Sequence, residues 1–554
     1  MSITLPRQAL QSPEGSAAGS VSPRHAPHGG FGAGVWPGSG FARLMLVVVF
    51  AVALAARLIP VLRGGGLFGD HGYDDGVYYA AATAFVHGQL PYRAFLLLHP
   101  PGIVLALAPF AVLGRLTTDP TGLAAARLAF MCLGAFNAVL VSGILIRRFG
   151  VVAAVTGGAV YAVGFPGLHG ERSALLEPLS NLGLLAALWL LHRWPRGRMP
   201  PWTTYAAGAA LGAGAAVKIW GVVPLLIVAL WQWAVSSRSA ARQVLGGGVL
   251  ATTGLCLSFF ALAPVEMVRM VVIDQLRRPA DGPSAGGRLR LVFGPYVVRG
   301  DGSMAYSAQP VWPVVAVAVL VVAIAASQRR ARIFAALTVT STTMVLLTPS
   351  FYLQYTAIVL APGALVAGAA ASTAIHGLTA TVVRRGRRSA ITGRRIVASW
   401  LIAVLAATVG YGLPGLIMTE GDALPFDQLR PVAARLPGCV LSDSPVAMVE
   451  LDVLSRNFSR GCAVSVDVTG STYDASARVG AGGEPVPRAE NDAWQRQLLG
   501  YLRSGSAVMV LRGDDGDGLS MQSRAVIDSW RVLTGNGRSR LFAPPPAAVQ
   551  RSAR

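Results

Sequence analysis

Charged residues are scarce in this chain of 554 residues, and lysine is almost absent. Only 13% of the residues are charged, and Lys218 is the single lysine. A soluble globular protein averages about 25% charged residues. Long apolar runs rich in Ala, Val, Leu and Gly replace the missing charge, and each spanning helix needs about 20 mainly apolar residues. The composition therefore predicts a polytopic membrane protein.

Cysteine is rare as well, and no Cys/His spacing resembles a zinc site. Cys132 and Cys256 lie inside apolar runs, as small core residues do. Cys439 and Cys462 lie in the polar C-terminal part of the chain. They can form a disulfide if that part lies outside the cytoplasm.

The excess of positive charge does not indicate nucleic-acid binding. The formal net charge is +21, but the arginines lie in short clusters between apolar runs. This distribution is typical of the loops that fix the orientation of a membrane protein. We therefore expect membrane lipids, and no nucleic acid, as partners of these arginines.

Three parts follow one another along the chain. Residues 1–40 are rich in Pro, Gly, Ser and His and are expected to form a disordered cytoplasmic tail. Residues 41–417 are expected to form an all-α membrane domain, and 418–554 an α/β domain outside the cytoplasm. About eleven apolar runs are predicted to span the membrane: 41–62, 124–146, 151–167, 178–192, 202–217, 219–236, 243–263, 311–327, 333–348, 353–375 and 399–417.

A shorter apolar segment, 102–114, is expected to be a re-entrant or interfacial helix. If the N-terminus is inside and this segment does not span, every basic cluster in a short loop falls on the inner side, as the positive-inside rule requires. All acidic residues between 41 and 417 then lie outside, many of them in two large loops, 63–123 and 264–310. Any carboxylate chemistry is therefore expected on the outer face of the plasma membrane.

The C-terminal part alternates between short strand and helix patterns. The predicted strands are 439–443, 462–467 and 507–513, and the predicted helices are 445–455, 489–503 and 521–533.

The first outer loop holds the densest polar cluster beside the membrane, residues 69–79. Its two adjacent carboxylates, Asp74 and Asp75, are costly to desolvate and are seldom idle in membrane proteins. The alternative is a structural role, in which one of them caps a helix that starts at Val77.

Several motifs, in this order, resemble those of bacterial relatives of the dolichyl-phosphate-mannose protein mannosyltransferases. These belong to glycosyltransferase family 39 and to the wider class with the GT-C fold. The motifs are Tyr73-Asp74-Asp75-x-x-Tyr78, Gly88-x-x-Pro91-Tyr92-Arg93, His99-Pro100-Pro101-Gly102, Glu171 to Pro178, Gly214 to Lys218, and Tyr352-Leu353-Gln354-Tyr355 before Pro362. The resemblance covers roughly residues 41–375.

The chain departs from this family at two positions, and these differences leave open which sugar is transferred. The family often has Asp-Glu in place of Asp74-Asp75, and His or Arg in place of Gln354. An Asp-Asp-Gly string is also similar to the arabinofuranosyl branch of the class.

The resemblance implies an integral-membrane glycosyltransferase. It would move a sugar from a polyprenyl-phosphate carrier to an extracytoplasmic acceptor hydroxyl on an envelope glycan, lipid or protein, with inversion. Asp74 would be the general base, with Asp75 as the rival assignment, and such a base contributes about 10²–10⁴-fold to the rate. No cofactor is expected. Some members of the class use a divalent metal, for which Asp74 and Glu177 would be the ligands, but none is expected here.

Further residues are candidates for binding the substrate or the lipid phosphate: Glu177, Lys218, Arg172, Tyr78, Arg93, His99, Gln354, Tyr355 and Arg299. Several of these residues have a structural role as the alternative to binding. Lys218 can extend to the lipid headgroups, Glu177 can stabilise a helix N-terminus, and the loop arginines can meet headgroups nonspecifically. Gln354 and Tyr355 can belong to an interfacial aromatic belt.

Two other functions compete with the transferase. One is a transporter or flippase of a lipid-linked intermediate, although the internal repeats common in transporters are absent from the sequence. The other is a non-catalytic envelope assembly protein. The acceptor, the role of the C-terminal domain and the oligomeric state stay open at this stage.

Overall fold

The structure is a computed structural model of the whole chain. It describes residues 39–194, 199–278, 282–294, 296–298, 304–306, 310–384, 395, 398–400, 402–403, 406, 410, 415–472, 486–512, 518–537 and 539–545. Residues Arg43–Arg554 form one compact unit. The predicted N-terminal tail lies almost entirely outside the described residues, as does most of the predicted run 399–417.

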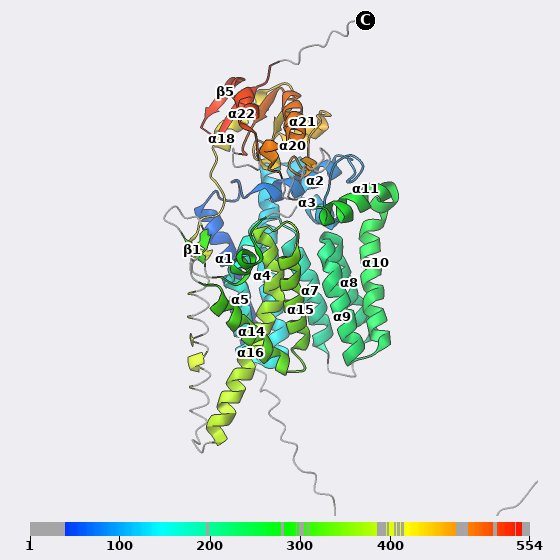
Figure 1. Cartoon of the computed structure of the whole chain (residues 1–554), viewed down its shortest axis with the longest axis vertical. Coiled ribbons are helices and arrows are strands. Elements are labelled where there is room, and N and C mark those ends of the chain that lie inside the picture. Colours follow the sequence, from blue (N-terminus) through cyan, green and yellow to red (C-terminus); the bar gives the residue numbers. More distant parts are fainter. Residues whose placement is uncertain are drawn as a thin grey trace, which may run out of the picture. The chain divides into compact units, whose positions relative to one another are not determined.

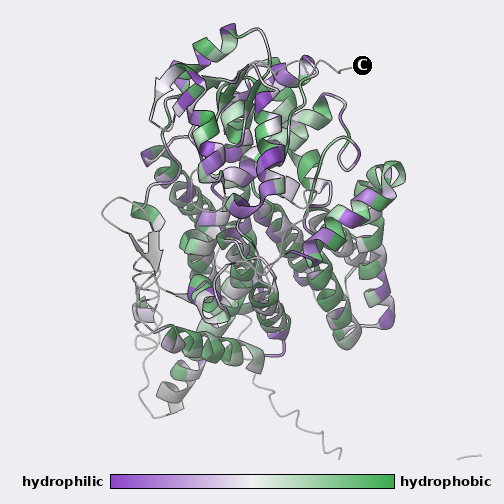
Figure 2. Ribbon diagram, turned by 45° about the horizontal axis from the view of Figure 1, so that its top comes forward, coloured by the Kyte–Doolittle hydropathy of each residue, from purple (hydrophilic) through white to green (hydrophobic). Residues whose placement is uncertain are grey.

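Each of the first ten predicted apolar runs coincides with a helix (Figure 1). These helices are largely hydrophobic along their whole length (Figure 2). They are α1 (Ser39–Arg63), α4 (Asp119–Phe149), α5 (Val151–Val163), α7 (Glu177–Arg193), α8 (Pro201–Val217), α9 (Val222–Val235), α10 (Arg238–Leu262), α14 (Trp312–Ser327), α15 (Arg332–Leu347) and α16 (Ala357–Arg384).

Four described segments are helical, long and apolar enough to cross a membrane. They are Gly40–Arg63, Asp119–Phe149, Arg238–Leu262 and Leu353–Thr379. Several of the remaining apolar helices are shorter, between 10 and 17 residues. These shorter helices coincide with predicted apolar runs that are themselves short in the sequence.

Glycines bring α8 and α10 into close contact. A Cβ atom added to Gly212 would lie 2.2 Å from the carbonyl oxygen of Gly248, and one added to Gly208 would lie 2.0 Å from that of Val244. Small residues of this kind let membrane helices approach each other closely. The small-residue composition of this part of the chain thus follows from the packing of its helices.

The loop predicted at 63–123 contains two helices, α2 (Tyr73–Val86) and α3 (Gly102–Leu116). They pack against each other, and α3 also packs against α4. The buried face of α3 is apolar and includes Ile103, Val104 and Leu107. The other side of α2 contacts the C-terminal domain through α19 (Pro445–Glu450), and Gly76 permits this contact because a Cβ there would lie 2.6 Å from the backbone nitrogen of Val446.

The loop predicted at 264–310, after α10, carries short helices and a hairpin. These are α11 (Pro264–Val268), the π-helix η2 (Arg269–Ile273), α12 (Asp274–Leu276), α13 (Ala285–Phe293), β1 (Tyr296–Val298) and β2 (Met304–Tyr306). Strands β1 and β2 pair antiparallel.

The C-terminal domain is built on a four-stranded mixed sheet in the order β3-β4-β6-β5. Its strands are β3 (Val440–Ser442), β4 (Ala507–Met509), β5 (Arg531–Asn536) and β6 (Ser539–Ala543). β3 and β4 are parallel, and the other two pairs are antiparallel. Its helices are α18 (Phe426–Arg435), α19, α20 (Leu454–Ser459), α21 (Asp492–Arg503) and α22 (Met521–Asp528). The predicted all-α membrane domain and small α/β domain are therefore both present.

Three predictions within this domain were wrong. The segment 462–467 is not a strand. A disulfide joins Cys462 to Cys439 just before β3, and the chain turns at Asp467, whose carboxylate accepts a hydrogen bond from the backbone nitrogen of Gly470. The predicted helix 521–533 ends at Asp528, and its last residues form β5. The predicted helix 445–455 is interrupted between α19 and α20 at Asp452, whose φ of 57° is left-handed.

Polar contacts fasten this domain to the N-terminal end of α4. Asp452 Oδ1 accepts from the backbone nitrogen of Asp119 at 2.8 Å, and the Asp119 carboxylate accepts from the backbone nitrogen of Ser455 at 2.8 Å. Deeper in the interface, Arg127 Nη1 lies 3.3 Å from Glu450 Oε1. These contacts hold the C-terminal domain against α4 and α2.

Candidate active site

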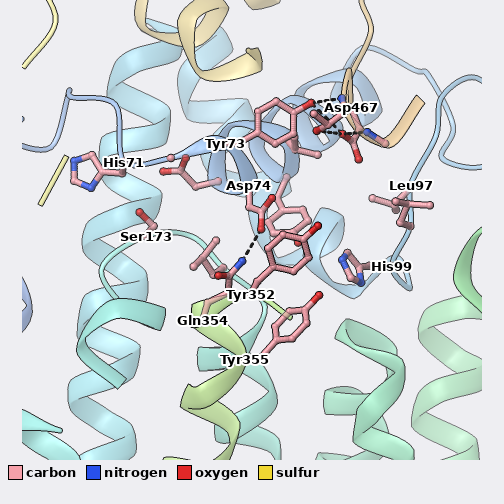
Figure 3. Close-up of a pocket in the computed structure, with 18 of the residues that line it drawn as sticks. His71, Tyr73, Asp74, Leu97, His99, Ser173, Tyr352, Gln354, Tyr355 and Asp467 are labelled. Carbon is pink, nitrogen blue, oxygen red and sulfur yellow. Dashed lines mark hydrogen bonds between the residues drawn. The ribbon is translucent and has the colours of Figure 1, made fainter. Parts of the chain in front are cut away.

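A cavity of about 330 Å³ lies between the membrane domain and the C-terminal domain (Figure 3). It is lined by segments that are far apart in the sequence: the start of α2, the loop before α3, the loops before α7 and α16, the loop 264–310, and loops of the C-terminal domain. Among its lining residues are Tyr73, Asp74, Tyr78, His99, Arg278, Gln354, Tyr355, Asp467, Arg488 and Arg512.

Asp74 lies in the first turn of α2. Gly72 directly precedes this helix, and its positive φ of 110° suits a glycine. Its Oδ2 accepts a hydrogen bond from Gln354 Nε2 at 2.8 Å. The pKa of Asp74 is raised to about 6, chiefly by burial and also by the nearby charges of Asp467 and Glu177, whereas Arg278 acts to lower it. The cavity thus holds a carboxylate that is more basic than an exposed aspartate.

Asp75 has a different environment, although it also borders the cavity. It is 1% exposed, and its Oδ2 accepts from Arg127 Nε at 2.8 Å. Arg127 donates as well to the carbonyl oxygens of Leu67 and Gly69. Asp75 is therefore part of a buried ionic group that joins α2, α4 and the C-terminal domain.

Lys218 and Glu177 form a buried ion pair beside the cavity. Lys218 Nζ lies 2.6 Å from Glu177 Oε1, and Lys218 is only 3% exposed. The ammonium also lies 3.7 Å from the centroid of the Tyr355 ring and 4.5 Å from that of Trp220. The lysine therefore does not extend to lipid headgroups, and its charge lies directly behind an aromatic wall of the cavity.

Tyr78 and His99 face each other across the cavity wall, with ring centroids 5.7 Å apart in an edge-to-face arrangement. Burial lowers the pKa of His99 well below its usual value, and the charges of Arg278 and Lys218 lower it further. A neutral imidazole at this place can both donate and accept a hydrogen bond.

The remaining candidate residues lie apart from Asp74 or outside the described residues. Arg172 Nη1 lies 3.0 Å from Glu420 Oε2, and this glutamate borders the cavity. Arg93 is exposed and is not among the residues that line the cavity. Arg299 lies outside the described residues.

The C-terminal domain supplies residues that the sequence analysis did not identify. Asp467 Oδ1 accepts from Tyr73 Oη at 3.0 Å and from the backbone nitrogen of Gly470 at 2.7 Å (Figure 3). The guanidinium of Arg512 lies 4.5 Å from the centroid of the Tyr73 ring. No local motif marks Asp467 or Arg512, and the contact between Tyr73 and Asp467 joins residues 394 positions apart.

A disulfide joins Cys439 to Cys462, the pair expected from the sequence. It links the start of β3 to the segment that leads to Asp467. Among the described residues, no group of three or more His, Cys, Asp or Glu side chains could hold a metal ion. Of the two metal ligands considered above, Glu177 contacts Lys218 and Asp74 contacts Gln354.

Known structures resemble this architecture, although no family model and no curated protein matches the sequence. ArnT from Cupriavidus metallidurans, bound to undecaprenyl phosphate, matches with a TM-score of 0.57 and 14% identity over 91% of this chain and 98% of ArnT. The oligosaccharyltransferase AglB from Archaeoglobus fulgidus, in complex with an inhibitory peptide and a dolichol-phosphate, matches with a TM-score of 0.51 and 13% identity over 85% of this chain and 69% of AglB. Both are glycosyltransferases with the GT-C fold. The predicted GT-C fold is thereby confirmed for this chain.

Proposed function

We propose that the chain is a membrane glycosyltransferase that moves a sugar from a polyprenyl phosphate to an acceptor hydroxyl at the outer face of the plasma membrane. The observation that carries this proposal is the position of Asp74, a half-buried carboxylate with a raised pKa that opens onto a cavity with cationic groups around it. The GT-C fold supports the donor class, since ArnT is seen with undecaprenyl phosphate and AglB with dolichol-phosphate.

Asp74 is suited to act as the general base. With a pKa of about 6 it is mostly ionised at neutral pH, and it binds a proton more readily than an exposed aspartate. The hydrogen bond from Gln354 fixes the orientation of the carboxylate. An acceptor hydroxyl bound next to Asp74 would lose its proton to this carboxylate as its oxygen attacks the sugar.

The reaction is then a single displacement. The acceptor oxygen forms a bond to the anomeric carbon while the bond from that carbon to the phosphate oxygen breaks. The electron pair of the broken bond stays on the lipid phosphate, and attack opposite the leaving group inverts the anomeric centre. No covalent sugar–enzyme intermediate is required.

The leaving phosphate gains negative charge, and fixed positive charge in a site of low dielectric stabilises it. Arg278 lines the cavity, with Nη1 3.5 Å from Tyr355 Oη, and the Lys218 ammonium lies behind the same tyrosine ring. We assign the phosphate to this side of the cavity, next to the membrane domain. The arginine fork matches phosphate oxygens in geometry.

The proposal is tested by transfer in lipid nanodiscs with a panel of polyprenyl-phosphate sugars and hydroxyl acceptors. Asp74→Asn keeps the size of the side chain, and we expect it to reduce transfer by about 10²–10⁴-fold. Asp427→Asn is the matched control, because Asp427 is 90% exposed on α18 and lies outside the cavity. Transfer that survives in Asp74→Asn, or a wild-type protein that translocates the lipid without transferring sugar, would overturn the proposal.

A further inference from the structure

Asp467 is a second carboxylate at the cavity, and the described residues donate hydrogen bonds to only one of its oxygens. Oδ1 accepts from Tyr73 Oη, from the backbone nitrogen of Gly470 and from Thr469 Oγ1, at 3.0, 2.7 and 3.3 Å. Within the described part of the chain, no hydrogen bond reaches Oδ2. Three donors on one oxygen hold the carboxylate in one orientation and leave the other oxygen as a free acceptor.

Arg512 provides a donor at the same cavity, beside the same tyrosine. Its guanidinium stacks on the ring of Tyr73, the same tyrosine whose hydroxyl binds Asp467. Its Nη1 is buried and has no hydrogen-bond partner within the described residues. The backbone of Arg512 is fixed, because its nitrogen and that of Leu511 donate to the buried carboxylate of Asp443 at 3.0 and 2.9 Å.

The arrangement pairs an unused acceptor with an unused donor around one aromatic ring. A buried donor without a partner is costly to the folded state, so such an atom in a cavity is a sign of a missing ligand group. A sugar hydroxyl can donate to a carboxylate and accept from a guanidinium at the same time. A phosphate or carboxylate would instead be repelled by Asp467.

We propose that Asp467 and Arg512 form an acceptor subsite for a carbohydrate, in which they bind a hydroxyl of the acceptor sugar close to the hydroxyl that attacks. This inference rests on the proposed function and narrows its acceptor from any hydroxyl to a glycan. A sugar carries hydroxyls on adjacent carbons, so one can meet Asp74 while its neighbour meets Asp467. The single hydroxyl of a serine or threonine cannot fill both places.

Two observations agree with this position for the acceptor. Asp467 is close enough to Asp74 for its charge to raise the pKa of that carboxyl. Asp467 and Arg512 also belong to the C-terminal domain, whereas Arg278 and Tyr355 belong to the membrane domain. The acceptor would thus enter from the domain side of the cavity and the lipid-linked donor from the membrane side.

Three variants test the subsite. Asp467→Asn and Arg512→Gln remove the two charges with little change in size. Gly470→Ala moves the carboxylate without removing it, because a Cβ at Gly470 would lie 2.2 Å from Asp467 Oδ2. Asp427→Asn is again the matched control, since it is in the same domain and outside the cavity.

The acceptors are octyl glycosides of mannose, arabinose, galactose and glucose, each with its set of monodeoxy analogues. For the glycoside that wild type uses best, we expect the acceptor KM to rise by about 10–100-fold in Asp467→Asn, Arg512→Gln and Gly470→Ala. The monodeoxy analogue that lacks the hydroxyl bound by Asp467 should be a poor acceptor for wild type. Asp467→Asn should not make this analogue a poorer acceptor still. Binding of undecaprenyl phosphate, measured by native mass spectrometry, should be unchanged.

The outcomes separate this inference from the proposed function. Transfer by wild type with an unchanged acceptor KM in all three variants would overturn the subsite and leave the transferase standing. A wild type that transfers to a serine peptide but to no glycoside would do the same. If wild type transfers to no acceptor, the proposed function fails, and glycoside binding by calorimetry still decides the subsite: equal affinity in wild type and Asp467→Asn refutes it.

Discussion

The side-chain amide of Gln354 donates a hydrogen bond of 2.8 Å to the carboxylate of Asp74, and it does so from 280 positions away in the sequence. The mannosyltransferase-like family often has His or Arg at this place. A cation there would favour the ionised carboxylate strongly, whereas a neutral amide favours it only through the hydrogen bond. Gln354 therefore orients the carboxylate of Asp74, and the pKa of Asp74 stays raised by burial.

Substitutions at Gln354 should move the acidic limb of the pH–rate profile in opposite directions. Gln354→Leu removes a hydrogen bond to the charged form, so the pKa of Asp74 should rise and the limb should shift to higher pH. Gln354→Arg adds a positive charge and should shift the limb to lower pH. A shift of about one pH unit corresponds to about 1.4 kcal/mol. Profiles of kcat/KM for the two variants measure this, and identical limbs would contradict a direct influence of Gln354 on the base.

The wild-type enzyme should itself lose activity on acidification. A general base works only when ionised, so kcat/KM should be constant well above pH 6 and fall tenfold per pH unit well below the pKa of Asp74, which is about 6. Asp467 and Glu177 raise this pKa, whereas Arg278 and Lys218 lower it. Asp467→Asn removes one of the raising charges and should move the limb to lower pH. A limb near pH 4 in wild type would show that another group, or none, acts as the base.

Asp75→Asn should act chiefly on stability. It leaves Arg127 buried without its ionic partner on α2, and breaking a buried ion pair typically costs about 3–5 kcal/mol. We expect a clear loss of thermal stability in detergent, followed by tryptophan fluorescence. Glu266→Gln is the control, because the ion pair of Glu266 with Arg269 is partly exposed and such pairs contribute about 0–1 kcal/mol. A variant with full stability and no transfer would instead support Asp75 as the base.

The pair of Lys218 and Glu177 requires a double substitution, because either single change leaves a buried charge alone. Lys218→Gln should destabilise the protein, and adding Glu177→Gln should restore much of the stability. If Lys218 stabilises the leaving phosphate, the double variant should still transfer at least tenfold more slowly than wild type. Normal transfer by the stable double variant would leave the pair with a structural role alone.

The sequence predicts the membrane domain well, because spanning helices are marked by local composition. The first ten apolar runs are helices, and 102–114 is the core of α3. Asp74 could also be singled out locally, as part of a polar cluster beside apolar segments. Asp74 and Asp75 could not be told apart, since adjacent helical residues differ by about 100° in direction, and only the positions of Gln354 and Arg127 separate their environments.

The cavity residues that come from the C-terminal domain could not be predicted from the sequence, for a different reason. Asp467 and Arg512 lie in loops without a motif, and they meet Tyr73 only because the C-terminal domain packs on α2. The alternation of apolar and polar residues at 462–467 suggests a strand. Instead this segment turns, and the turn places the carboxylate of Asp467 at the cavity. Long-range packing of this kind leaves no trace in local periodicity.

The disulfide should matter both for stability and for the acceptor. It joins cysteines 23 positions apart, and a loop of this length corresponds to about 3 kcal/mol of stabilisation in the chain-entropy model. Cys462 lies five residues before Asp467, so its release should also loosen the proposed acceptor subsite. We therefore expect the Cys439→Ser/Cys462→Ser variant to lower the melting temperature and to raise the acceptor KM, with little change in binding of undecaprenyl phosphate. Cys132→Ala is the control, because this cysteine is unpaired in α4. A reductant should lower the acceptor affinity of this control variant as it does that of wild type. If the double variant melts earlier but keeps the wild-type acceptor KM, the bond stabilises the domain without positioning Asp467.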